Sequence, residues 1–260
     1  MKTLLLAFIF LPFIILAEDW NGFRGNLRDG KSNEKGLLNK WPEDGPKLLW
    51  TKENIGLGYS GFSTADGKAF IMGTRDNKTV LFCLDENTGK ELWSKTVSQS
   101  IFEDSFGDGP RGTAMLDEGK AYVLSGSGDL VCFEKTTGEK VWSVNMKQFG
   151  GKIPNWGYAE TPLIDGNKLL CTPGGPQGSV IALDKTNGKL IWQSKNFTES
   201  AQHSSIIKVK WNGVDQYIRF MLKSCVGINT ENGHMFYWII TRNKFPIYQS
   251  AERRKSIIIL

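Results

Sequence analysis

An apolar run of strand length, a polar turn and a second apolar run recur along this chain. The first copy reads LFCLDENTGKELW between Leu81 and Trp93, close copies occupy 130–142 and 180–192, and a more divergent copy occupies 225–237. Each polar turn ends in a glycine, which supplies the positive φ that tight hairpin turns require. The pattern therefore predicts a β-hairpin in every copy.

Two further strand-like stretches, split by a turn, precede each of the three close copies. These stretches are Gly61–Ala65 with Lys68–Gly73, Thr113–Leu116 with Lys120–Ser125, and Glu160–Ile164 with Lys168–Thr172. The turn glycines recur every 45 to 50 residues, at Gly89, Gly138, Gly188 and Gly233. Four strands in about 45 residues are typical of one blade of a β-propeller. The chain is thus predicted to be all-β, an incomplete propeller of about four four-stranded blades, of which the fourth is partial.

A tryptophan closes each close copy of the hairpin, at Trp93, Trp142 and Trp192. Aromatic rings can sandwich a flat cofactor, but the fixed place of these rings after the hairpin favours packing against the neighbouring blade. Trp50 stands in a similar run, Leu48–Trp50, without a hairpin before it. We expect Leu48–Trp50 to form an outer strand at the N-terminal edge, where it would complete the final blade.

The hairpin pattern Leu-Asp-x-x-Thr-Gly-Lys-x-x-Trp resembles the repeat of the pyrroloquinoline-quinone-like (PQQ-like) β-propellers. That group includes quinoprotein alcohol dehydrogenases and BamB-like outer-membrane assembly scaffolds. The segments that open the chain and lead into the blades are similar to those of secreted BamB-like members. They are 20–30, 45–50, 107–111 and 155–160. The resemblance implies the fold but leaves the activity open, because one propeller hosts catalysts and inert scaffolds alike.

The two ends of the chain differ from the repeats between them. Residues 1–17 combine Lys2, a short apolar core and Ala17, which is typical of a cleaved secretory signal peptide. We therefore expect a periplasmic or secreted protein with no membrane span after cleavage. Residues 18–47 form an N-terminal extension, residues 48–238 the blades, and residues 239–260 an atypical tail. That tail is either an interaction segment or non-native sequence from a frameshift or truncation.

Charge and cysteine usage narrow the function classes further. The whole chain carries a net charge of +5, but residues 18–238 are neutral, so the folded part lacks the basic face that nucleic-acid binding needs. Cys83 and Cys132 share a repeat position at which the third copy has Ala182. Cys171 and Cys225 lie on other expected strands. We predict that all four are buried free thiols rather than disulfide partners.

Aligning the innermost strands gives a candidate ligand site at the mouth of the central channel. Tyr59, Arg111, Tyr158 and His203 fall at one level, and Glu160 lies in or beside the same loops. A cation, two phenols, an imidazole and a carboxylate could hold an anionic or sugar-like ligand, or a metal. The alternative is a hydrated channel whose polar groups satisfy one another. Only two histidines occur in the chain, which excludes a histidine-rich metal centre.

Two functions remain in competition. The first is a non-catalytic binding or scaffold module of the cell envelope, with no cofactor, whose partner is a protein or a cell-envelope glycan. The second, which the resemblance implies, is a PQQ-dependent oxidoreductase or a fragment of one, with PQQ and calcium in the channel and a carboxylate as general base. No catalytic residue is identified from the sequence, and the first function is preferred.

Overall fold

The computed structural model describes residues 18–105 and 107–240. The expected signal peptide, residues 1–17, and all but the first two residues of the expected tail lie outside this described part. Within it the structure contains four four-stranded antiparallel sheets and one short 3-10 helix, η1 (Met146–Phe149). No helix in these two ranges is long and apolar enough to cross a membrane.

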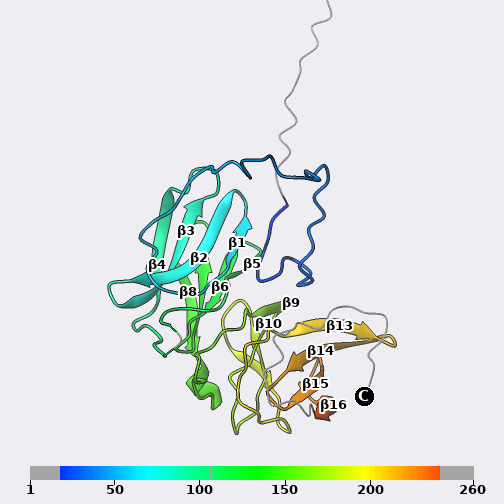
Figure 1. Cartoon of the computed structure of the whole chain (residues 1–260). Helices are drawn as coiled ribbons and strands as arrows, with labels where there is room; N and C mark the ends of the chain where they lie inside the picture. Colours follow the sequence, from blue (N-terminus) through cyan, green and yellow to red (C-terminus); the bar gives the residue numbers. More distant parts are fainter. Residues whose placement is uncertain (1–17, 106, 241–260) are drawn as a thin grey trace, which may run out of the picture.

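Each sheet is one blade, and its four strands follow chain order from the innermost outward. Blade 1 consists of β1 (Phe62–Ala65), β2 (Lys68–Arg75), β3 (Lys78–Asp85) and β4 (Glu91–Ser98). Blade 2 consists of β5 (Met115–Asp117), β6 (Lys120–Leu124), β7 (Asp129–Glu134) and β8 (Lys140–Asn145). Blade 3 consists of β9 (Leu163–Asp165), β10 (Lys168–Cys171), β11 (Ile181–Asp184) and β12 (Leu190–Gln193). Blade 4 consists of β13 (Ile207–Trp211), β14 (Val214–Phe220), β15 (Ser224–Asn229) and β16 (Met235–Ile240). The blades follow one another from cyan to orange in Figure 1, which confirms the predicted all-β, incomplete propeller.

Blade 4 is more complete than the sequence suggested, because its divergent hairpin keeps the turn geometry. In blade 1, Oδ1 of Asp85 accepts hydrogen bonds from the backbone N–H groups of Asn87 and Thr88. In blade 4, Oδ1 of Asn229 accepts the equivalent bonds from Glu231 and Asn232. Asparagine thus replaces aspartate without loss of the turn, and the expectation of a partial fourth blade was wrong.

Aromatic rings lie against the turn glycine of the next blade at every joint. A Cβ added at Gly138 would lie 2.7 Å from the ring of Trp93, and one at Gly188 would lie 2.8 Å from that of Trp142. Trp192 lies against Gly233 in the same way. All of these glycines also have positive φ, so both the turn and the close approach of the ring require glycine.

Trp50 occupies the equivalent place on blade 1 without belonging to a strand. Its ring lies against Gly89 and its Nε1 donates to the carbonyl of Glu86 at 2.9 Å, but residues 48–50 pair with no strand among the described residues. The expected edge strand at Leu48–Trp50 was therefore wrong. The chain instead continues along the outer face of blade 1, where Ile55 accepts a hydrogen bond from the backbone of Thr74 at 2.9 Å.

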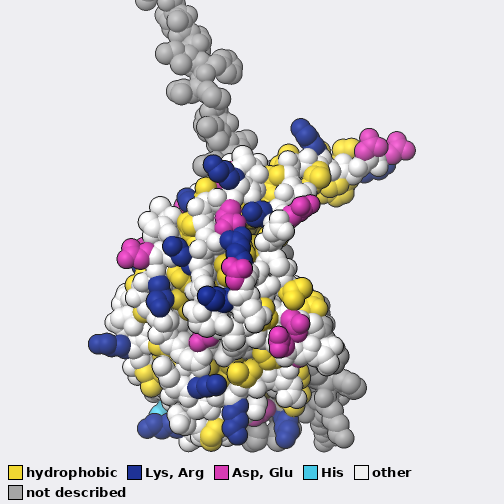
Figure 2. All heavy atoms as spheres, turned by 90° about the vertical axis from the view of Figure 1, so that its left-hand side faces the viewer, with side chains coloured by type: hydrophobic (Ala, Val, Ile, Leu, Met, Phe, Trp, Pro, Cys, Tyr) yellow, Lys and Arg dark blue, Asp and Glu magenta, His cyan; other side chains and the backbone are white. Residues whose placement is uncertain are grey.

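The core consists of apolar layers between successive blades, plus a smaller layer under Trp50 and Ile55. The four cysteines belong to the strands that form these layers and are free thiols, as predicted, but only Cys83, Cys132 and Cys171 are buried, whereas Cys225 is partly exposed. Burial raises the pKa of Cys83 to about 12 and that of Cys225 to about 11, so both thiols stay protonated at neutral pH. On the face shown in Figure 2, basic and acidic side chains are interspersed, with no field of a single sign.

Residues 18–30, which we call the N-terminal strap, contact the inner edge of every blade. Trp20 forms a β-bridge with Thr64 of β1, and the carbonyl of Asn21 accepts a hydrogen bond from Leu116 of β5 at 2.8 Å. Arg28 reaches blades 3 and 4, where it donates to the carbonyl of Ile206 at 3.0 Å. In Figure 1 the dark-blue chain passes beside β1 and β5. The strap therefore lies along the inner strands, on the side where a propeller has its channel.

An ion-pair cluster on blade 1 predicts how stability depends on pH. Arg75 donates two hydrogen bonds to Glu91, and Lys52 lies 3.3 Å from the same carboxylate. These cations hold the pKa of Glu91 at about 2, below its ordinary value of 4.5. A depressed pKa in the folded state contributes stability above the ordinary pKa, and this contribution is lost as the pH falls toward the folded value.

We therefore expect wild-type stability to fall between about pH 5 and about pH 2, and Glu91→Gln to flatten this dependence. The check is the urea midpoint as a function of pH. Glu139→Gln, which alters an exposed glutamate on blade 2, is the matched control and should keep the wild-type slope. Identical slopes for all three proteins would contradict the prediction.

Candidate functional site

The five residues expected at the channel mouth all lie in the loops that enter the inner strands. Tyr59 precedes β1, Arg111 precedes β5, Tyr158 and Glu160 precede β9, and His203 precedes β13. The alignment of the repeats thus assigned them to equivalent loops. Their side chains have different surroundings, however: Tyr59 is exposed beside a largely buried Arg111, His203 is a stacked imidazole, and Tyr158 and Glu160 are buried.

Arg111 and Tyr59 come together at the mouth. The guanidinium of Arg111 lies 2.9 Å from Asp104, 4.7 Å from the ring centre of Phe102 and 5.6 Å from that of Tyr59. It also donates to the carbonyls of Gly107 and Gly109, both at 2.6 Å. Arg111 therefore organises a loop with its own carboxylate and aromatic partners.

The Gly107–Gly109 loop explains why the sequence before Arg111 is rich in glycine. Both glycines have positive φ, and a Cβ at Gly107 would lie 2.0 Å from the hydroxyl oxygen of Tyr59. A Cβ at Gly109 would meet the backbone of Leu57 at 2.7 Å. The loop can therefore pack against the segment that enters β1 only without side chains at these two positions.

His203 stacks on Trp156, with ring centres 4.6 Å apart and planes 23° apart. Burial, followed by the charges of Arg111 and Arg219, lowers the pKa of His203 below its ordinary value of 6.5. The imidazole is therefore neutral at pH 7. It contributes a flat aromatic surface and hydrogen-bonding nitrogens, but no charge.

Tyr158 and Glu160 lie beneath the surface and do not line an accessible mouth. Tyr158 is 2% exposed, and its hydroxyl donates to the carbonyls of Pro173, at 2.9 Å, and Lys152, at 3.2 Å. Glu160 is also 2% exposed and accepts hydrogen bonds from the backbone N–H and the hydroxyl of Thr172. The single carboxylate among the five candidates is thus sealed inside the protein.

Glu160 pairs with Arg219, a residue that the sequence analysis missed. The two side chains lie 3.5 Å apart, and Arg219 is fully buried. Burial raises the pKa of Glu160, and the charge of Arg219 opposes this shift. A signal was present in the sequence, because Arg219 lies two residues after Tyr217 on the same strand and therefore shares the face with which Tyr217 packs into the core between blades 3 and 4.

The residues of this site do not fit the calcium and quinone of the alternative function. Among the described residues, no group of three or more histidine, cysteine, aspartate or glutamate side chains could hold a metal ion. Glu160 would be the channel base, but both of its oxygens are engaged with Thr172 and Arg219. The cavity next to His203 has a volume of about 170 Å³, whereas cofactor sites typically have about 300–1,000 Å³.

Comparisons with known proteins relate the chain to quinoproteins. The dehydrogenase subunit of the alcohol dehydrogenase (quinone) of Gluconacetobacter polyoxogenes is 29% identical over 195 residues, which cover 69% of this chain and 26% of that protein. The corresponding subunit of Gluconobacter oxydans (strain 621H) is 30% identical over 135 residues, 47% of this chain and 17% of that protein. The chain thus spans about a quarter, or less, of the length of these relatives.

Solved structures show the same fold. The quinohemoprotein alcohol dehydrogenase ADHIIG of Pseudomonas putida HK5 superposes with a TM-score of 0.63 at 17% identity, over 85% of this chain and 40% of that one. The quinohemoprotein alcohol dehydrogenase of Comamonas testosteroni gives a TM-score of 0.55 at 13% identity, over 85% and 49%. Residues 76–236, more than half of the chain, match the family model described as outer membrane protein assembly factor BamB. The chain is a PQQ-like β-propeller protein and belongs to this BamB family.

Proposed function

We propose that this chain is a non-catalytic binding module of the cell envelope, which uses the channel mouth to contact a protein partner. The observation that carries the proposal is the state of Glu160. The carboxylate that an oxidoreductase would use as a base is 2% exposed and paired with Arg219, whereas the exposed side chain at the mouth is Tyr59, which lies beside the largely buried Arg111–Asp104 pair. Such a surface can bind, but among the five candidate residues it offers no accessible carboxylate for proton transfer.

The segment that enters β1 has the composition of a protein-binding surface. Leu57, Tyr59 and Phe62 are 56%, 62% and 64% exposed, and Arg111 lies beside Tyr59. Tyrosine and arginine are enriched among the residues that dominate binding energy at protein interfaces, and neighbouring exposed apolar side chains mark such sites. This composition favours a protein over a glycan partner.

The family description supports the same function and location. The matching family is named for the assembly of outer membrane proteins, and residues 1–17 have the composition of a secretory signal. We therefore place the chain in the periplasm or outside the cell, as a scaffold that holds other proteins. The competing function, a quinone-dependent oxidoreductase, has support in the 29% identity to alcohol dehydrogenase subunits.

Photocrosslinking from the mouth tests the proposal. A photoreactive amino acid at position 59 should capture an envelope protein. Arg111→Gln should reduce this capture several-fold, because the guanidinium supports the loop against Tyr59. The matched control is the same photoreactive residue at Leu92, an exposed position on β4 that is 46% exposed. Equal capture from both positions would contradict the proposal, and so would quinone- and calcium-dependent dye reduction by the purified chain.

A further inference from the structure

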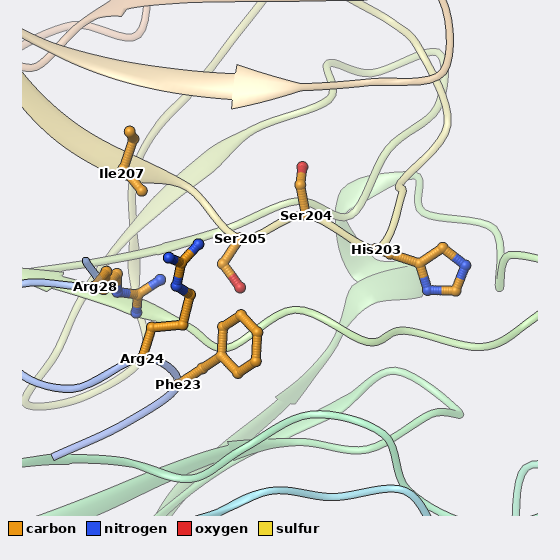
Figure 3. Close-up of a pocket in the computed structure, with 7 residues that line it drawn as sticks. All are labelled: Phe23, Arg24, Arg28, His203, Ser204, Ser205 and Ile207. Carbon is orange, nitrogen blue, oxygen red and sulfur yellow. The ribbon is translucent and has the colours of Figure 1, made fainter. Parts of the chain in front are cut away.

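A cavity with a volume of about 170 Å³ lies between the N-terminal strap and the start of blade 4. Phe23, Arg24 and Arg28 of the strap line it together with His203, Ser204, Ser205 and Ile207. These seven described residues include no acidic side chain. In Figure 3, Arg24, Ser205 and Phe23 face one another, whereas the ring of His203 points away from them. The cavity is therefore a compact space whose wall is basic and hydroxylated.

The charge around the cavity is unbalanced. Arg28 is 8% exposed and its guanidinium donates to backbone carbonyls, those of Thr161 at 3.1 Å, Ile206 at 3.0 Å and Pro162. These acceptors are uncharged. Behind Arg28, the buried carboxylate of Glu160 is already paired with Arg219. The buried guanidinium groups of Arg28 and Arg219 thus have one buried carboxylate, that of Glu160, between them. Arg24 adds a third cation at the cavity wall.

The pKa values agree with this excess of positive charge. Burial lowers the pKa of Arg28 to about 10, and the charge of Arg219 contributes to the same shift. The guanidinium nevertheless stays charged at neutral pH. Burial also raises the pKa of Glu160, and the charges of Arg219 and Arg28 oppose this shift. An anion in the cavity would relieve the imbalance.

Hydrogen-bond donors remain for such an anion. Arg24 makes one long hydrogen bond, from Nη2 to the carbonyl of Asp29 at 3.3 Å, and it has five N–H donors in all. The hydroxyl of Ser205 accepts a bond from the backbone of Thr161 at 3.0 Å, and its own hydrogen is available to donate. The backbone of Arg24 has a φ of 65°, in the left-handed region that non-glycine residues rarely adopt. The side chain of Arg24 lines the cavity.

We propose that this cavity binds a small oxyanion, a carboxylate or phosphate group, through Arg24 and Ser205. The volume limits the ligand, because a cavity of about 150 Å³ accommodates benzene. A ligand with a single anionic group fits, whereas a nucleotide or a three-ring quinone does not. Planar guanidinium groups bind carboxylate and phosphate through paired hydrogen bonds. This site is separate from the Tyr59–Arg111 surface, so it does not depend on the proposed function.

Calorimetric titration of the purified full chain tests the site. Sodium phosphate and sodium acetate serve as probes, each compared with sodium chloride at equal ionic strength. We expect one or both oxyanions to bind with one site per chain, and the stronger of the two identifies phosphate or carboxylate as the group recognised. Arg24→Gln should weaken binding at least about tenfold, because hydrogen bonds to charged groups are among the strong ones.

Arg75→Gln is the matched control, since it removes the same charge from the outer face of blade 1. It should leave the affinity for the oxyanion unchanged. Arg24→Lys keeps the charge but loses the planar fork, and an intermediate affinity is expected. Equal weakening by Arg24→Gln and Arg75→Gln would overturn the proposal, because it would show a general effect of charge. Wild-type heats no greater than those with chloride would overturn it as well.

Discussion

Trp142→Ala should destabilise the protein by about 3–5 kcal/mol, the usual cost of removing a large aromatic side chain from a core. Trp142 is 8% exposed, lies against Gly188 of the next blade, and its Nε1 donates to the carbonyl of Lys185 at 3.0 Å. On the other side its ring centre lies 6.1 Å from that of Tyr122. Truncation therefore opens a cavity at the joint between blades 2 and 3 and leaves a carbonyl without its donor.

Urea unfolding measures this effect, with Trp41→Ala as the control. Trp41 is 63% exposed on the N-terminal extension, so its removal should change the free energy of unfolding by less than about 0.5 kcal/mol. Trp142→Phe keeps most of the ring and should lose less than Trp142→Ala. If Trp142→Ala and Trp41→Ala lowered the free energy of unfolding by the same amount, the prediction that the Trp142 ring stabilises the joint between blades 2 and 3 would be wrong.

Arg219→Met should cost about 3–5 kcal/mol at neutral pH, because it leaves the carboxylate of Glu160 buried without its cation. The double variant Glu160→Gln, Arg219→Met should recover much of this loss, since no buried charge is then left unpaired by the change. The free energies of unfolding of the four proteins in this cycle give the coupling energy directly.

The pH dependence of Arg219→Met provides a second readout. Burial already raises the pKa of Glu160, and removing Arg219 raises it further, because that cation favours the ionised form. A raised pKa in the folded state means that stability is lost as the pH rises through that value. The deficit of Arg219→Met relative to wild type should therefore shrink as the pH falls from neutral toward 4.5, the ordinary pKa of a glutamate. A deficit that does not change with pH would show that lost packing, and not the unpaired charge, causes it.

The repeats could be predicted from the sequence because their determinants are local. A hairpin turn depends on a few adjacent residues, so Asp85 and Gly89 identify blade 1 without knowledge of the rest of the chain. The same logic failed at Asn229, where a substitution that keeps the acceptor oxygen was read as degeneration. It failed again at Leu48–Trp50, where apolar composition indicated a strand. The structure has no strand there, and Trp50 contacts blade 1 through its ring and its Nε1–H.

The candidate site could be predicted only as far as the repeat alignment reaches. The alignment identified equivalent loop positions, but it carries no information on which side chains point outward. Tyr158 and Glu160 are buried because of partners elsewhere in the chain, Pro173 and Arg219. The role of Arg28 could not be predicted for the same reason. Its acceptors, the carbonyls of Thr161 and Ile206, are distant in the sequence and lie in the segments that enter blades 3 and 4.

The N-terminal strap has a consequence for the order of folding. Arg28 and Ile206 are 178 residues apart in the sequence, so the strap is synthesised first while its last acceptors are synthesised near the end. Each hairpin can form from neighbouring residues, but the strap can complete its contacts only after the start of blade 4 exists. Contacts between residues so distant in sequence slow folding, because the loop between them must close first. Until then the inner strands keep unpaired edges, which favour association with other chains. The strap thus completes its contacts only after the blades that it joins have formed.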